Sequence, residues 1–199
     1  PIKVRVSSRS EDGFRSAVLH MIDMLRGLGD VGADPLLIDA ACDRLHRIHG
    51  ETADSGDPFE AALRQAARDM LAMFPKGCTD LPDLKGGPLE TFRKDLANLR
   101  AAVETDRLSY DWKLWGKLRD LRMTKRGCLT PPGYDAHAEA VMAAAARIVD
   151  HPGPRDDALL HLRCLIGGAQ AIMADYADRK RNLGVIDFSD MIVEAERLL

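Results

Sequence analysis

Residues 154–192 read PRDDALLHLRCLIGGAQAIMADYADRKRNLGVIDFSDMI. Pro154 suits the first turn of a helix, where backbone amides have no intrahelical partner. Apolar residues then keep helical spacing as far as Gly184: Leu165, Ile172, Met173 and Tyr176. Gly184 suits the position after a helix end, and Asp187 is placed to cap a new helix. The stretch therefore predicts a long helix, a short turn and a second helix.

Cap and breaker residues divide the rest of the chain in the same way. Asp34-Pro35 and Asp57-Pro58 each pair a helix cap with a proline at the first helical position. Alanine and leucine, which favour helix, are abundant, whereas β-branched residues are sparse. Residues 2–6 alternate apolar and charged side chains, which is the period of a strand. We therefore predict an all-α fold, an irregular multi-helix bundle with at most one short strand near residues 2–6.

Positive charge is concentrated in one segment of a slightly acidic chain. The net charge is -3, whereas residues 91–126 hold ten Lys or Arg and five Asp or Glu, a local charge of +5 that leaves -8 for the remainder. Such a segment is a candidate surface for a polyanion. A helix pair with solvated side chains explains the same pattern, so both interpretations stay open here. The candidate contacts are Lys113, Lys117, Arg119, Arg122, Lys125 and Arg126.

Two tryptophans lie inside this basic segment. Trp112 and Trp115 could stack on nucleic-acid bases. Tryptophans three residues apart beside Leu118 are more typical of a helix face turned to a core, and Ser109 is placed to cap that helix. We therefore predict that the tryptophans pack inside the protein.

The chain carries none of the common nucleotide-binding or catalytic motifs. It contains no GxxxxGK[ST] loop, no GxGxxG, no GxSxG and no HExxH. Cys42, His46 and His49 fall near one helix face, but two arginines lie among them and no fourth ligand is evident, so no metal site is predicted. The four cysteines are widely spaced, as is typical of reduced thiols in a cytoplasmic protein. No run approaches the roughly 18 apolar residues of a membrane span, so no membrane partner is expected.

One stretch is specific. Residues 176–192 read YADRKRNLGVIDFSDMI and resemble the Y…K…G.(L/I)DF.D(L/M)(L/I) signature of UvrD/RecB/AddA-type superfamily 1 DNA helicases. The matching positions are Tyr176, Lys180, Gly184, Ile186, Asp187, Phe188, Asp190, Met191 and Ile192. Residues 112–118, WKLWGKL, are similar to the W.KL element of RecB- and AddA-like members. The same residues also suit plain structural roles, with Asp187 as a cap, Gly184 as a helix stop, and Phe188 and Ile192 in a core.

The resemblance implies a place in a larger protein. In that family the signature precedes the Walker B motif, where the chain returns from the inserted helical subdomain 1B to the motor domain 1A. Residues 1–183 would then form a 1B-like accessory subdomain, and residues 184–199 would begin the return into the motor domain. The abrupt start at Pro1 and the end at Leu199 within a helical pattern agree with this interpretation.

The implied function is DNA binding within an ATP-dependent DNA helicase or helicase–nuclease of repair and recombination. No catalytic residue is transferred to this chain, which is expected to lack ATPase activity and to hold no cofactor. ATP and Mg²⁺ are implied for the parent protein. The implied partners are single-stranded or forked DNA, the motor domains of the same parent and a second subunit of a helicase–nuclease complex. The alternative is a helical protein–protein interaction module with no role in nucleic-acid binding.

Overall fold

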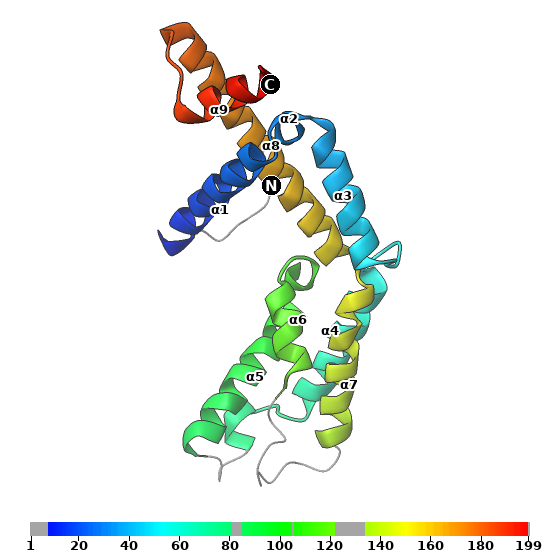
Figure 1. The fold of residues 1–199 in the computed structure, drawn as a ribbon. Helices are drawn as coiled ribbons and strands as arrows, with labels where there is room; N and C mark the ends of the chain where they lie inside the picture. Colours follow the sequence, from blue (N-terminus) through cyan, green and yellow to red (C-terminus); the bar gives the residue numbers. More distant parts are fainter. Residues whose placement is uncertain (1–7, 81–84, 105, 122–133, 199) are drawn as a thin grey trace. The chain divides into compact units, whose positions relative to one another are not determined.

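The computed structural model describes residues 8–80, 85–104, 106–121 and 134–198 (Figure 1). This part of the chain consists of nine α-helices and three short 3-10 helices, without a strand, which confirms the predicted all-α fold. The predicted strand near residues 2–6 lies outside these ranges. The α-helices are α1 (Ser8–Gly27), α2 (Asp30–Ala33), α3 (Leu36–His49), α4 (Asp57–Ala72), α5 (Gly86–Glu104), α6 (Trp112–Arg119), α7 (Tyr134–Ala146), α8 (Pro152–Leu183) and α9 (Phe188–Arg197), and the 3-10 helices are η1 (Gly77–Asp80), η2 (Asp106–Ser109) and η3 (Arg147–Asp150).

The contacts divide the chain into two compact units. Unit 1 comprises residues 1–49 and 157–199, and unit 2 comprises residues 50–156. The second division falls inside α8, so its first residues belong to unit 2. The sequence-based boundary between residues 1–183 and 184–199 is a different kind of division, and it stays a prediction.

Unit 2 is built on four helices that pack side against side. In Figure 1, α4 lies next to α5 and α7, and α6 lies next to the same two helices. Each helix turns one apolar stripe inward at a spacing of three or four residues, as an amphipathic helix requires. In α4 the fully buried stripe consists of Leu63, Ala67 and Met70, and in α7 it consists of Tyr134, Ala138, Val141 and Ala145.

The largest side chain of this core is Trp115 of α6, which has no exposed surface. Its indole Nε1 donates a hydrogen bond to the Leu108 carbonyl oxygen at 2.9 Å, so the polar atom is satisfied inside the core. The prediction that the tryptophans are core residues is confirmed for Trp115, and Trp112 is half-buried against the same core.

Unit 1 has a smaller core. Ile22 and Leu25 of α1 are buried together with Ile166 and Ala169 of α8, and Ile38 of α3 packs against them. A polar side chain also links α8 to the α2 region of this unit. The Gln170 amide of α8 donates hydrogen bonds to the carbonyl oxygens of Gly32 and Asp34.

Some helix ends differ from the sequence prediction. The N-cap of α6 is Asp111, whose carboxylate accepts a hydrogen bond from the Leu114 amide at 3.2 Å. Ser109, the predicted cap, ends η2 and donates instead to Glu60 at 3.1 Å. The long helix α8 begins at Pro152, two residues before the predicted Pro154.

Candidate nucleic-acid interface

The exposed face of α6 carries two of the predicted DNA contacts. Leu114, Trp115 and Leu118 of this helix are buried. Because these three side chains occupy the inward face of α6, Lys113 and Lys117, which are one turn apart, lie on its exposed face. The helix thus holds two ammonium groups on a rigid element.

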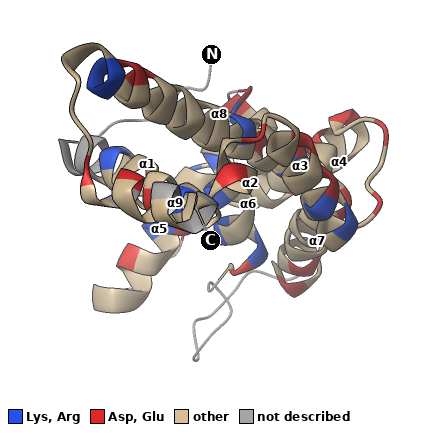
Figure 2. Ribbon diagram, turned by 45° about the horizontal axis from the view of Figure 1, so that its top comes forward, with Lys and Arg blue, Asp and Glu red and all other residues tan. Residues whose placement is uncertain are grey.

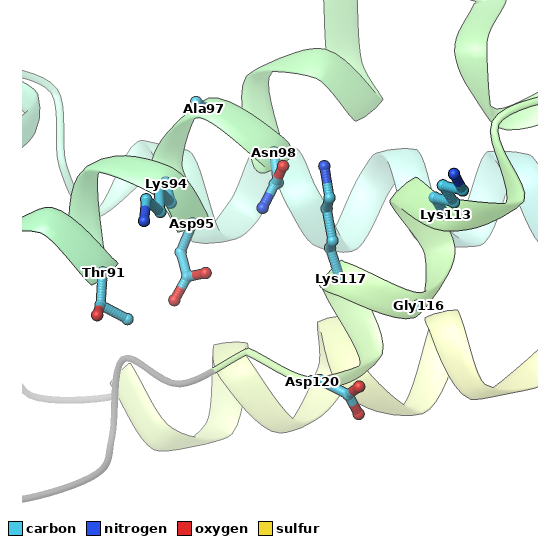
Figure 3. Close-up of a pocket in the computed structure, with 9 residues that line it drawn as sticks. All are labelled: Thr91, Lys94, Asp95, Ala97, Asn98, Lys113, Gly116, Lys117 and Asp120. Carbon is cyan, nitrogen blue, oxygen red and sulfur yellow. The ribbon is translucent and has the colours of Figure 1, made fainter. Parts of the chain in front are cut away.

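These lysines line an open groove between α6 and α5. The groove encloses about 720 Å³ and is lined by Thr91, Lys94, Asp95, Ala97, Asn98, Lys113, Gly116, Lys117 and Asp120. Lys117 extends from α6 toward the side of the groove formed by α5, where Asn98 lies (Figure 3). The groove therefore combines cationic and amide donors with the hydroxyl of Thr91.

The lysines and the aspartates of the groove differ in whether their charges are exposed and unpaired. Lys94, Lys113 and Lys117 are exposed and form no ion pair or hydrogen bond with the described residues. Asp95 is buried, with an exposed fraction of 7%, and Asp120 lies 3.5 Å from Arg119. Lys and Arg are interspersed with Asp and Glu along the helices (Figure 2). The groove differs from these mixed helix surfaces, because its three lysines are exposed while its acids are buried or paired.

The structure brings together only part of the predicted contact set. Lys113 and Lys117 share the groove, whereas Arg119 is exposed outside its lining and pairs with Asp120. Arg122, Lys125 and Arg126 lie outside the described residues. Lys94 was not predicted as a contact, although it belongs to the basic segment. The helical spacing of Lys94 and Asn98 placed both on one face of α5, but nothing local indicated that this face meets α6.

The signature residues form a second polar cluster, in unit 1. Lys180 of α8 lies with its Nζ 3.0 Å from Asp187 Oδ2 and 2.6 Å from Asp190 Oδ2. The same Nζ is 4.9 Å from the ring centroid of Tyr176, and Arg26 of α1 lies 5.4 Å from that ring. Two cations therefore contact one aromatic ring, and one of them also holds two carboxylates.

Electrostatics stabilise the charged forms in this cluster. Burial alone would lower the pKa of Lys180, but hydrogen bonds to Asp190 and Asp187 outweigh it and raise the pKa above its ordinary value. The backbone amide of Asp190 and then Lys180 lower the pKa of Asp187. Lys180 and then the amide of Asp187 lower the pKa of Asp190. The cluster is thus a neutralised structural clamp, with no general acid or base close to neutral pH.

Backbone geometry completes the α8–α9 turn. Gly184 adopts φ 65°. Its amide donates to Arg181 O at 3.2 Å, and the Val185 amide donates to Lys180 O at 3.1 Å, the two bonds of a Schellman motif. Asp187 and Asp190 then form a capping box at the start of α9, in which each carboxylate accepts from the other residue's amide.

The interpretation that places Phe188 and Ile192 in a core is not met within this chain, where Phe188 is 72% exposed and Ile192 is 46% exposed. The capping box and the clamp hold α9 through polar atoms, so Phe188 and Ile192 can be exposed without loss of these contacts. Periodicity showed that α9 is amphipathic, but it did not reveal what the apolar face contacts.

Other kinds of site lack support. Within the described ranges, no three His, Cys, Asp or Glu side chains come together as metal ligands would. None of the helices in those ranges has both the length and the apolar composition needed to cross a membrane. Comparison of the chain with protein-family models, with curated proteins and with solved structures finds no match.

Proposed function

We propose that this chain is a DNA-binding accessory part of an ATP-dependent DNA helicase of the UvrD/RecB/AddA type. The observation that carries the proposal is the α5–α6 groove, where Lys94, Lys113 and Lys117 are exposed on two packed helices without ion-pair partners among the described residues. Ammonium groups at such a surface neutralise backbone phosphates and release condensed counterions. Binding of this kind positions DNA without reading its sequence.

The second support is the signature that the α8–α9 turn contains. Tyr176, Lys180, Gly184, Asp187 and Asp190 all take part in one turn and clamp. The same arrangement suits an unrelated helical protein, so it supports the family only together with the sequence match. Under the proposal, ATP and Mg²⁺ bind in motor domains of the parent protein, which works in the cytoplasm, and a second subunit can join it. The chain itself has no Walker A sequence, so we predict that it has no ATPase activity.

The test is DNA binding by a charge-reversal variant and a matched control. The triple variant K94E/K113E/K117E removes the free cations of the groove. The control R15E/R44E/R68E makes the same change in net charge at exposed arginines that neither line the groove nor pair with an acid among the described residues. Labelled single-stranded and forked DNA are titrated with each protein at several salt concentrations.

The wild-type chain should bind both DNAs weakly, with a dissociation constant on the order of 10⁻⁴ M or weaker near physiological salt. Three phosphate contacts predict a log–log salt slope of about -2 on single strands. The groove variant should lose binding, whereas the control should keep most of the affinity and the same slope. Equal weakening by both variants would mean that net charge alone drives binding, and the groove assignment would then fail.

A second candidate function is a protein–protein interaction module. It is favoured by unit 1, which exposes large apolar side chains on several helices and on the turns between them, among them Phe14, Leu28, Ile172, Ile186, Phe188 and Met191. Where exposed apolar side chains form one contiguous patch, they mark interaction sites in soluble proteins. If wild type and groove variant bind DNA equally, or if neither binds, this alternative gains. In the full gene, a hydrophobic strand ending in Asp-Glu-x-Gln soon after Leu199 would favour the helicase.

A further inference from the structure

His151 occupies an unusual place in unit 2. Its side chain is buried, with an exposed residue fraction of 4%. The ring centroid lies 5.1 Å from that of Trp112 and 5.5 Å from that of Trp115, both on α6, and 6.0 Å from that of Phe59 on α4. A Cβ atom added at Gly56 would lie 2.1 Å from His151 Nε2, so the backbone also closes around the ring. An imidazole thus fills an aromatic pocket.

The same ring caps the start of α8. His151 has φ -77° and ψ 129°, the extended conformation of an N-cap residue. Its Nδ1 accepts a hydrogen bond from the Gly153 amide at 3.0 Å. Pro152 and Pro154 have no amide hydrogen. Gly153 therefore holds the one amide hydrogen of the first three positions of α8, and His151 satisfies it.

This bond defines the protonation state of the ring. Nδ1 can accept only when it carries no proton, so a neutral His151 must carry its hydrogen on Nε2. The buried Nε2 has no hydrogen-bond partner within the described part of the chain. The Glu60 carboxylate of α4 lies close to it, with Oε1 3.6 Å from Nε2. Glu60 Oε2 in turn accepts from Ser109 and lies 3.8 Å from Arg64.

We propose that His151 is a proton-operated cap of α8, so that acidification releases the Gly153 amide and uncaps the helix. When Nδ1 gains a proton it becomes a donor and can no longer accept from Gly153. The resulting positive charge also lies at the amino end of a helix, where the helix dipole opposes it. The charge is drawn instead to Glu60 and away from the backbone of α8. The other groups packed on the ring, Phe59, Trp112 and Trp115, carry no charge, and Arg147 and Asp150 on the preceding turn pair with each other at 2.6 Å.

The protein contains its own optical reporter of this event. Both of its tryptophans, Trp112 and Trp115, contact His151. A charge that appears on the imidazole should change the emission of both indoles. Fluorescence of the wild-type chain, followed as the pH is lowered from neutral, should therefore pass through a transition. His151→Asn keeps a good N-cap residue without an imidazole and should abolish the transition. His137→Asn, on α7 of the same unit, is the control and should leave it intact.

Nuclear magnetic resonance of the unmodified chain tests the cap itself. Imidazole nitrogen shifts at pH 8 should show the hydrogen of His151 on Nε2. As the pH is lowered through the fluorescence transition, the protection of the Gly153 amide against hydrogen exchange should fall by roughly fivefold, which corresponds to the ~1 kcal/mol of an N-cap. A hydrogen on Nδ1 at pH 8 would overturn the proposal. Unchanged Gly153 protection while the fluorescence transition occurs would also overturn it, because the ring would then titrate without releasing the helix.

Discussion

Lys180 and Asp190 join the end of one helix to the start of the next: the ammonium Nζ of Lys180 lies 2.6 Å from Asp190 Oδ2, across the α8–α9 turn. The same Asp190 carboxylate accepts from the Asp187 amide at 2.8 Å. One carboxylate therefore serves both the clamp between two helices and the cap of the second helix. Since the described large apolar side chains of α9 (Phe188, Met191 and Ile192) are exposed, these polar contacts are the local support that the structure describes for this helix.

The clamp predicts the effect of removing its cation. Lys180→Met keeps the aliphatic length over the Tyr176 ring but deletes the ammonium group that holds Asp187 and Asp190. Hydrogen exchange in α9 should accelerate, while exchange in the helices of unit 2 stays unchanged. Arg179→Met is the control, because Arg179 is exposed and pairs only with Asp175 among the described residues. Similar acceleration in both variants would show that the clamp does not support α9.

The clamp also predicts a pH dependence. The pKa values of Asp187 and Asp190 lie below their ordinary value of 3.8, and the pKa of Lys180 lies above its ordinary value of 10.5. The carboxylates thus contribute stability that is present above 3.8 and is lost as pH falls through their lowered pKa values. The ammonium contributes stability below 10.5 that is lost as pH rises through its raised pKa. The protection of α9, corrected for intrinsic exchange, should therefore be flat from about pH 5 to 9. A change in that window would contradict the assignment.

The N-cap of α6 gives a prediction for unit 2. Asp111→Ala removes the acceptor of the Leu114 amide and should lower the free energy of unfolding by about 1 kcal/mol. Because α6 carries Lys113 and Lys117, DNA binding should weaken as well. Ser109→Ala, at the position that the sequence pattern favoured as the cap, should change stability by less than Asp111→Ala. Denaturant titration followed by tryptophan fluorescence measures both variants, since Trp112 and Trp115 lie in unit 2. A larger loss with Ser109→Ala would reverse the assignment of the cap.

The exposure of Phe188 and Ile192 predicts that this chain tolerates polar substitutions at both positions. Each of Phe188→Ser and Ile192→Ser should change the free energy of unfolding by no more than ~0.5 kcal/mol, as is usual at exposed positions. Leu25→Ala, at a site only 2% exposed in the core of the same unit, should cost about 2–5 kcal/mol. Thermal unfolding followed by circular dichroism compares them. In the proposed parent helicase the double variant should impair assembly of the motor domain. A large loss of stability in the isolated chain would mean that the two side chains are buried in solution.

Local features were predictable because their causes lie within a few residues of each other. Gly184 as a helix stop, Asp187 as a cap and the apolar stripes that make the fold all-α follow from backbone sterics, hydrogen-bond geometry and a period of 3.6 residues. The burial of Trp115 followed from the same periodicity. Competing caps were harder, because Ser109 and Asp111 are both good cap residues and only the packing of η2 against Glu60 separates them.

The tertiary structure decided what depends on contacts between distant segments. Lys94 joins Lys113 and Lys117 in one groove because α5 packs against α6, and no local pattern in either helix encodes that meeting. His151 became a buried cap only when α4 and α6 brought Phe59, Trp112 and Trp115 around it. The exposure of Phe188 also depends on contacts with distant segments. Amphipathic periodicity shows that a helix has an apolar face, but whether that face is buried depends on a free-energy gain from a surface elsewhere in the fold or in a partner.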